Sequence, residues 1–127
     1  MTNELYWKKA ISLTNKAIDL QSLVPLKTTS KKVFNNSDKY FELRKLVTSL
    51  ISKDNTYGPK VNPFKPWDTN LQVSLISETH ALILNKYPVQ KGHMLLITNK
   101  WSPQNGWIND DDWRSLSYVN SDTSGLW

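Results

Sequence analysis

Hydrophobic positions near the amino terminus follow a helical period. Between residues 7 and 21 they recur every three or four positions, which predicts an amphipathic helix. Thr2 or Asn3 is the expected N-cap, because either side chain can accept a hydrogen bond from the first turn. Pro25 ends the pattern. We expect this helix to cover one face of a sheet.

The next part of the chain has a mixed pattern. Residues 27–32 are polar and partly β-branched, and the Asn-Asn-Ser-Asp sequence of residues 35–38 predicts a turn. Residues 40–44 suit a strand, whereas the apolar positions within residues 43–51 match a helical face. We therefore expect a short strand that passes into a helix. Two prolines predict an extended chain in residues 60–67.

The centre of the chain follows a strand period. Apolar and polar residues alternate over residues 71–75, and residues 77–79 predict a turn, so residues 80–85 are expected to return antiparallel. Residues 81–84 are apolar on both faces, as in an inner strand covered by helices. A third strand is expected over residues 93–98. The sequence thus predicts an α+β fold, an antiparallel sheet with helices packed on one side.

A second helix is predicted after Asn109, which suits the N-cap position. Residues 110–112 are all Asp, and their negative charge is favourable in the first turn of a helix. Ile108 and Trp113 have the spacing of a hydrophobic staple, and we expect Trp113 and Leu116 to pack on the sheet. Capping and solvation explain the three carboxylates better than a metal site does, because adjacent helical residues point in different directions.

Composition narrows the class of protein. The chain has 127 residues, so we expect a single domain over residues 1–127, with residues 1–58 as an amino-terminal helical or extension region. No apolar run approaches the ~18 residues of a membrane span, and no signal-peptide pattern is present, which suggests a soluble cytoplasmic protein. With no Cys and 2 His, neither a disulfide nor a metal site is expected, and no cofactor is implied.

The charge is distributed unevenly. Lys and Arg outnumber Asp and Glu by 16 to 11, which gives a net charge of +5. Residues 1–65 have a net charge of +7 and residues 66–127 a net charge of −2. A basic half suits an anionic partner such as a nucleotide, a nucleic acid or an acidic surface. Because 14 of the 16 basic residues are scattered lysines, a solvated lysine face is favoured over a nucleic-acid surface.

Four side chains are candidates for binding or catalysis, and each has a structural alternative. His80 and His93 could act as general bases, but a lone His at a strand end is more often a hydrogen-bonded structural residue. Lys60 could contact a polyphosphate or merely solvate a linker. Asn85 could bind the hydroxyls of a ribose or turn the chain at the end of a strand. Spacing alone leaves these alternatives open.

The order of these segments resembles the histidine-triad superfamily. Residues 80–98 match its strand–loop–strand core, in which an apolar strand ends in Asn-Lys and is followed by Pro-Val, Gly-His and a second apolar strand. The Asn-Pro-Phe-x-Pro sequence within residues 59–68 and the Leu-x-Pro-x-x-Thr of residues 23–28 resemble ATP adenylyltransferase, also called diadenosine tetraphosphate (Ap4A) phosphorylase. Gln104 and residues 111–113 fit the linker and helix that follow this core.

This resemblance implies a reaction and a set of binding residues. Family members attack the α-phosphate of Ap4A with a histidine, form a nucleotidyl-histidine and transfer the nucleotide to inorganic phosphate, which yields ATP and ADP. By position in the motifs, Asn85 would hold ribose and Lys60 would contact the phosphate chain. Asn62 and His93 would support the site, His93 as part of the scaffold. The implied partners are these nucleotides and phosphate; no membrane partner is expected, and the oligomeric state is left open.

The His-x-His-x-Gln motif of the family does not occur in the 127 residues. The resemblance places it after a strand that begins near residue 125. We therefore expect the chain to be an amino-terminal portion of an ATP adenylyltransferase, incomplete at the carboxy-terminal end of its fold and inactive in phosphorolysis. No catalytic residue is assigned. The alternative is a non-catalytic module that uses its basic half to bind nucleic acid or an acidic partner.

Overall fold

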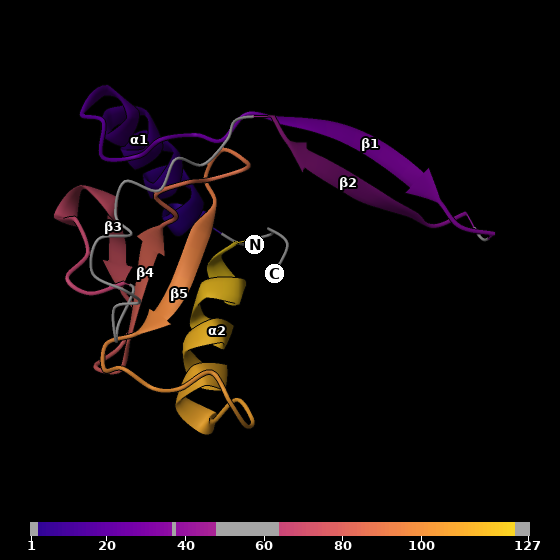
Figure 1. Ribbon diagram of the computed structural model, residues 1–127. Coiled ribbons are helices and arrows are strands. Elements are labelled where there is room, and N and C mark those ends of the chain that lie inside the picture. Colours follow the sequence, from indigo (N-terminus) through magenta and orange to yellow (C-terminus); the bar gives the residue numbers. More distant parts are fainter. Residues whose placement is uncertain (1–2, 37, 48–63, 124–127) are drawn as a thin grey trace.

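The computed structural model describes residues 3–36, 38–47 and 64–123, which form two helices, one 3-10 turn and two antiparallel sheets (Figure 1). The fold class predicted from the sequence is confirmed. In chain order the elements are α1 (Leu5–Asp19), β1 (Thr28–Phe34), β2 (Tyr40–Leu46), η1 (Thr69–Leu71), β3 (Gln72–Leu75), β4 (His80–Leu84), β5 (Met94–Thr98) and α2 (Asp110–Asp122).

The three-stranded sheet has the order β3-β4-β5 and is antiparallel throughout, as predicted. All five residues of the central strand β4 are buried. Leu82 and Leu84 join the main core with Ala10 and Val119, so that α1 and α2 both cover the same face of the sheet. This arrangement confirms the prediction that the helices lie on one side.

The opposite face of the sheet is covered differently from the prediction. Ala81 and Ile83 of β4 and Ile97 of β5 form a second core, against which Phe64 and Trp67 pack. A loop rather than a helix therefore covers this face of the inner strand. Residues 64–66 form a turn and bends instead of the predicted extended chain, whereas residues 60–63 lie outside the described residues.

β1 and β2 pair with each other in a hairpin that projects from the body of the molecule (Figure 1). Residues 35, 36 and 38 of the predicted turn lie between them, and the strand predicted from residue 40 is confirmed. No helix begins within residues 43–47, because Leu43 and Leu46 pair across the hairpin with Lys31 and Thr28. The rest of the expected helix lies outside the described residues.

The first helix begins at Leu5, where Glu4 is the N-cap and makes no side-chain capping bond. The prediction of Asn3 as the cap is wrong, and Thr2 lies outside the described residues. The helix ends at Asp19 because Gln21 adopts a left-handed conformation, with φ of 58°. The amides of Gln21 and Ser22 donate to the carbonyls of Ile18 and Ala17, which is a Schellman motif with Gln in the usual position of Gly.

The second helix begins as predicted. Asn109 accepts a hydrogen bond from the Asp112 amide, and the Asp112 carboxylate accepts one from the Asn109 amide, which completes a capping box. The predicted packing of Trp113 on the sheet is wrong. Ser115 and Val119 face the core instead, and Trp113, two positions before Ser115, points to the other side of the helix and is 56% exposed. Leu116 is half-buried. Within the described residues, no helix has the length and apolarity needed to cross a membrane.

Candidate functional site

A cavity of about 530 Å³ lies where the end of β4 meets the loop that covers the second core. Its volume is within the usual range for small-molecule sites. The loop before η1 supplies aromatic and carboxylate groups, and the residues after β4 supply an amide and an ammonium group. Lining residues include Phe64, Trp67, Asp68, Asn85, Lys86 and Tyr87.

Asn85 directly follows β4, and the oxygen and the nitrogen of its side-chain amide differ in their hydrogen bonding. The Oδ1 atom accepts a hydrogen bond of 3.0 Å from the Tyr87 amide, which turns the chain out of the strand. The turn alternative from the sequence is therefore correct for this oxygen. The side-chain nitrogen of Asn85 forms no hydrogen bond to a described residue, and Asn85 lines the cavity.

Charged groups of both signs lie on the rim of this cavity. Lys86 is exposed, and its ammonium lies 5.6 Å from the centroid of the Tyr87 ring. The Asn70 amide donates to Asp68 and, with the Ser22 hydroxyl, holds the pKa of the Asp68 carboxyl below its ordinary value. Asp68 therefore stays ionised at neutral pH, beside the lysine.

The aromatic wall of the cavity is held in place by the sheet. The indole N–H of Trp67 donates to Gln72 Oε1 at 3.1 Å, and the Lys65 ammonium lies 5.4 Å from the Trp67 ring centroid. Aromatic rings of this kind provide a flat apolar surface for the base of a nucleotide, whereas amide and ammonium groups suit its sugar and phosphates. The chemistry of the cavity is thus compatible with a nucleotide.

Two of the four residues assigned from the sequence can be placed. Lys60 and Asn62 lie outside the described residues. Asn85 and His93 are neighbours, since the backbone N–H of Asn85 donates to the backbone carbonyl of His93 at 2.9 Å. Their side chains line different cavities: that of Asn85 lines the cavity described above, and that of His93 lines a second one of about 840 Å³ between α1, β5 and α2.

The His93 ring has a buried nitrogen, Nδ1, with no hydrogen-bond partner among the described residues. Gly92 precedes it with φ of 74°, and the Trp7 side chain of α1 lies directly against this glycine. The Gly-His pair therefore marks a close approach between the β5 strand and α1. A buried nitrogen without a partner is uncommon in folded proteins, which makes His93 a candidate for interaction with a further group.

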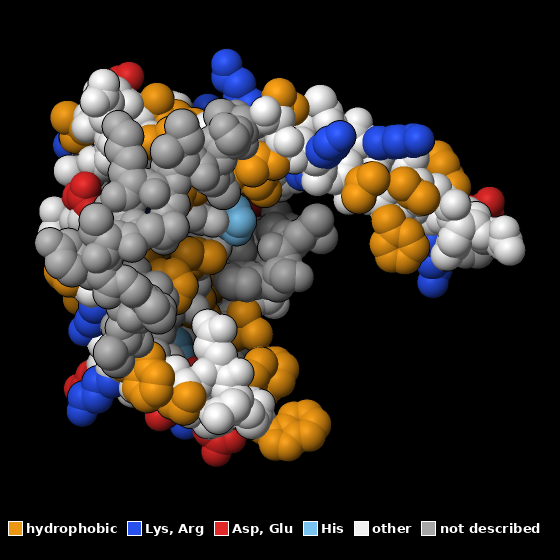
Figure 2. Space-filling model, in the orientation of Figure 1, with side chains coloured by type: hydrophobic (Ala, Val, Ile, Leu, Met, Phe, Trp, Pro, Cys, Tyr) orange, Lys and Arg blue, Asp and Glu red, His pale blue; other side chains and the backbone are white. Residues whose placement is uncertain are grey.

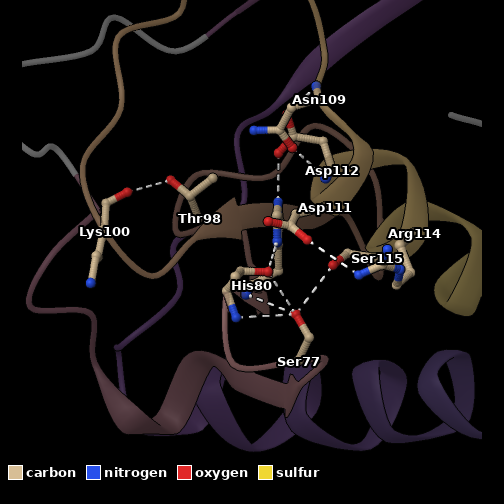
Figure 3. A network of polar contacts seen from close by, with 10 residues as sticks. Ser77, His80, Thr98, Lys100, Asn109, Asp111, Asp112, Arg114 and Ser115 are labelled. Atoms are coloured by element: carbon tan, nitrogen blue, oxygen red, sulfur yellow. Dashed lines mark hydrogen bonds and ion pairs between the residues drawn. The ribbon is translucent and has the colours of Figure 1, made fainter.

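His80 belongs to a separate polar network that connects β4 to α2 (Figure 3). Its Nε2 lies 2.7 Å from Asp112 Oδ1, and its Nδ1 lies 2.8 Å from the Thr79 hydroxyl. Ser77 Oγ accepts from the His80 amide and lies 3.3 Å from Ser115 Oγ on the helix. Both ring nitrogens of His80 are engaged and its side chain is 4% exposed, which supports its interpretation as a structural residue.

Two groups were not predicted from the sequence. Lys86 lines the same cavity as Asn85, and the Asn-Lys pair already identified in the motif was the signal for it. The partnership of Asp112 with His80 spans 32 positions, and no local pattern predicts it. Among the described residues, no group of three or more His, Cys, Asp or Glu side chains could hold a metal ion.

The fold and the cavity together define an α+β domain with an aromatic-walled site at one end of its sheet. A sequence model of the Ap4A phosphorylase N-terminal domain matches residues 1–127. The chain belongs to this family, which confirms the resemblance of its sequence to Ap4A phosphorylase. No curated protein sequence matches the chain significantly.

Solved structures of yeast Ap4A phosphorylase Apa2 share the fold. The structure of Apa2 alone has a TM-score of 0.74 and 22% identity and covers 96% of this chain. The structure of the AMP complex has a TM-score of 0.70 and 22% identity and covers 94% of this chain. The structure of the Ap4A complex has a TM-score of 0.70 and 21% identity and covers 97% of this chain. The chain spans only 38–41% of the length of these three structures.

Proposed function

We propose that this chain forms a nucleotide-binding part of an Ap4A phosphorylase, as a single domain of histidine-triad type. The enzyme would cleave Ap4A with inorganic phosphate to give ATP and ADP. The observation that carries the proposal is the cavity that Asn85 and Lys86 line together with aromatic residues, in a chain of this family. Yeast Apa2, which shares its fold, has been solved with AMP and with Ap4A.

Within this proposal, the residues around Asn85 contact different parts of the nucleotide. The side-chain amide of Asn85 donates to a ribose hydroxyl, and the ammonium groups of Lys86 and Lys60 contact phosphate oxygens. Lys60 precedes the cavity residue Phe64 by four positions, so a chain reach of about 14 Å at most separates their backbones. This reach is short enough for Lys60 to serve the same nucleotide, and Asn62 lies between the two.

His93 has a supporting role in the proposal. Its buried Nδ1 lacks a partner among the described residues, and such an atom is stabilised when another group forms a hydrogen bond to it. The nucleophilic histidine and transition-state glutamine of the family's His-x-His-x-Gln motif are absent from the 127 residues. We assign the nucleotidyl-histidine step to that motif and the binding of the nucleotide to the present cavity.

The first prediction concerns catalysis. The purified 127-residue chain is expected to bind nucleotide but to show no phosphorolysis of Ap4A above the uncatalysed rate, because it has no His-x-His-x-Gln nucleophile. Chromatographic analysis of ATP and ADP formed from Ap4A and phosphate measures this directly. Turnover by material of verified mass would contradict our assignment of the chemical step.

The second prediction concerns binding of AMP, ATP and Ap4A, measured by calorimetry. Asn85→Asp keeps a side-chain oxygen that accepts from the Tyr87 backbone N–H, but it removes the two N–H donors of the Asn85 side chain. Lys86→Ala removes an ammonium group. We expect each to weaken binding by roughly tenfold, the equivalent of one lost hydrogen bond of about 1.4 kcal/mol. Lys60→Ala should have a similar effect.

The matched controls are Asn120→Ala and Lys16→Ala, at exposed helix positions that do not line the cavity. They should leave the affinity unchanged. Equal affinity of the Asn85→Asp and Lys86→Ala variants and the unaltered chain would refute the assigned site. Absence of any nucleotide binding by a folded chain would refute the proposed function as a whole.

A further inference from the structure

The loop of residues 99–109 connects β5 to α2 and contains the one Asn-Gly pair of the sequence, Asn105 and Gly106. It passes across the lower end of the molecule (Figure 1). Figure 2 shows hydrophobic side chains and uncharged polar surface together at this end. Both residues of the pair are exposed. Exposed loop positions are accessible to water and to chemical modification.

The side chain of Asn105 differs from those of the other asparagines in the same loop. Asn99 Nδ2 donates to the Glu78 carbonyl at 2.9 Å, and Asn109 Oδ1 accepts from the Asp112 backbone N–H at 2.9 Å. The side chain of Asn105 forms no hydrogen bond to a described residue. Its amide group is therefore not held in one orientation by a polar contact.

The peptide nitrogen that follows this side chain is also open. The backbone N–H of Gly106 donates to no acceptor among the described residues. Gly106 has φ of 82°, and a Cβ at this position would meet nothing within 4 Å. Because glycine has no Cβ, no side chain of its own shields this nitrogen from the neighbouring Asn105.

We propose that Asn105 is a modification site, at which the chain deamidates through a cyclic imide. The Gly106 nitrogen forms a bond to the side-chain carbonyl carbon of Asn105 and loses its proton, and the side-chain nitrogen leaves as ammonia. Water then opens the imide at either of its carbonyl groups, which gives isoaspartate or aspartate. Water is the only other reactant, and no electrons are transferred.

The products change the charge and the backbone of the loop. Either product lowers the net charge of +5 by one and adds a carboxylate to a cavity of about 740 Å³, which Asn105 lines together with Trp101 and Asp112. Isoaspartate also adds a methylene group to the main chain. This group is the substrate of isoaspartyl methyltransferases, which use S-adenosylmethionine, so the modified chain is a substrate for that class of enzyme.

Incubation of the folded 127-residue chain at mildly alkaline pH, followed by peptide mapping with mass spectrometry, tests this inference independently of nucleotide binding. We expect Asn105 to react at least about tenfold faster than Asn99 and Asn109, which corresponds to about 1.4 kcal/mol of activation free energy. The rate should rise with pH, because loss of its proton makes the Gly106 nitrogen a better nucleophile. Methyl transfer from labelled S-adenosylmethionine by an isoaspartyl methyltransferase measures the isoaspartate formed.

Two variants serve as matched controls, and circular dichroism verifies that both are folded. Gly106→Ala places a methyl group beside the attacking nitrogen, and Asn105→Gln requires a larger ring, so each should slow the reaction at residue 105 by about tenfold or more. Two outcomes would overturn the inference. One is an unchanged Asn105 in the folded chain under conditions in which a peptide of residues 101–109 deamidates. The other is reaction of Gly106→Ala at the rate of the unaltered chain.

Discussion

Replacement of Asp112 by Ala is expected to lower the free energy of unfolding by about 2–3 kcal/mol, as loss of a hydrogen bond to a buried partner does. One oxygen of this carboxylate lies 2.7 Å from His80 Nε2, and the other accepts from the Asn109 amide at 3.0 Å. The substitution leaves a buried imidazole nitrogen without a partner and removes half of the capping box. Both losses act at the junction of β4 and α2.

Asp111→Ala is the matched control, because it removes the adjacent carboxylate from the same first turn. The side chain of Asp111 is 51% exposed, and among the described residues it pairs only with Arg114, at 3.3 Å. Exposed pairs contribute little, so we expect a loss of about 0.5 kcal/mol or less. Urea denaturation followed by circular dichroism measures both variants. Equal losses for the two would show that the negative charge at the helix start matters and that the contact with His80 does not.

Gly92→Ala is expected to destabilise the domain by about 2–4 kcal/mol through two additive effects. The residue has φ of 74°, where an L side chain is strained. A Cβ at this position would lie 2.6 Å from an atom of the Trp7 ring and 3.0 Å from Ile11 Cδ1. The ring and the isoleucine must move away, which separates α1 from the start of β5.

Gly106→Ala separates the two effects. Gly106 has a similar φ of 82°, but a Cβ there would meet nothing within 4 Å. We expect it to cost about 1 kcal/mol, the backbone strain alone. Thermal and urea unfolding of the two variants give the difference, which is the cost of displacing Trp7. If the two variants lose the same stability, the close contact between Gly92 and α1 has no energetic weight.

The candidate site was only partly accessible from the sequence. The Asn-Lys and Gly-His pairs led to Asn85 and His93 through the family resemblance, and the structure places Asn85 on a cavity beside Lys86. The sequence alone did not decide whether the Asn85 side chain contacts a ribose or turns the chain. The hydrogen bond from the Tyr87 amide shows that its side-chain oxygen turns the chain, whereas its side-chain nitrogen forms no hydrogen bond to a described residue.

Local chemistry in the sequence determined the elements whose signals lie within a few residues. The alternation before Ser77 and the apolar run after it determine the strands β3 and β4, and Asn109 with its three aspartates determines the start of α2. Each depends on side-chain period or capping, which involve neighbours only.

The tertiary structure alone decided how these elements meet. It placed the β1–β2 hairpin outside the body, turned Trp113 toward solvent, covered one face of β4 with a loop and joined His80 to Asp112. These outcomes depend on which apolar faces can be buried together once distant segments compete for the same core. Packing between distant segments decides which faces are buried, and the periodicity within one segment cannot predict that packing.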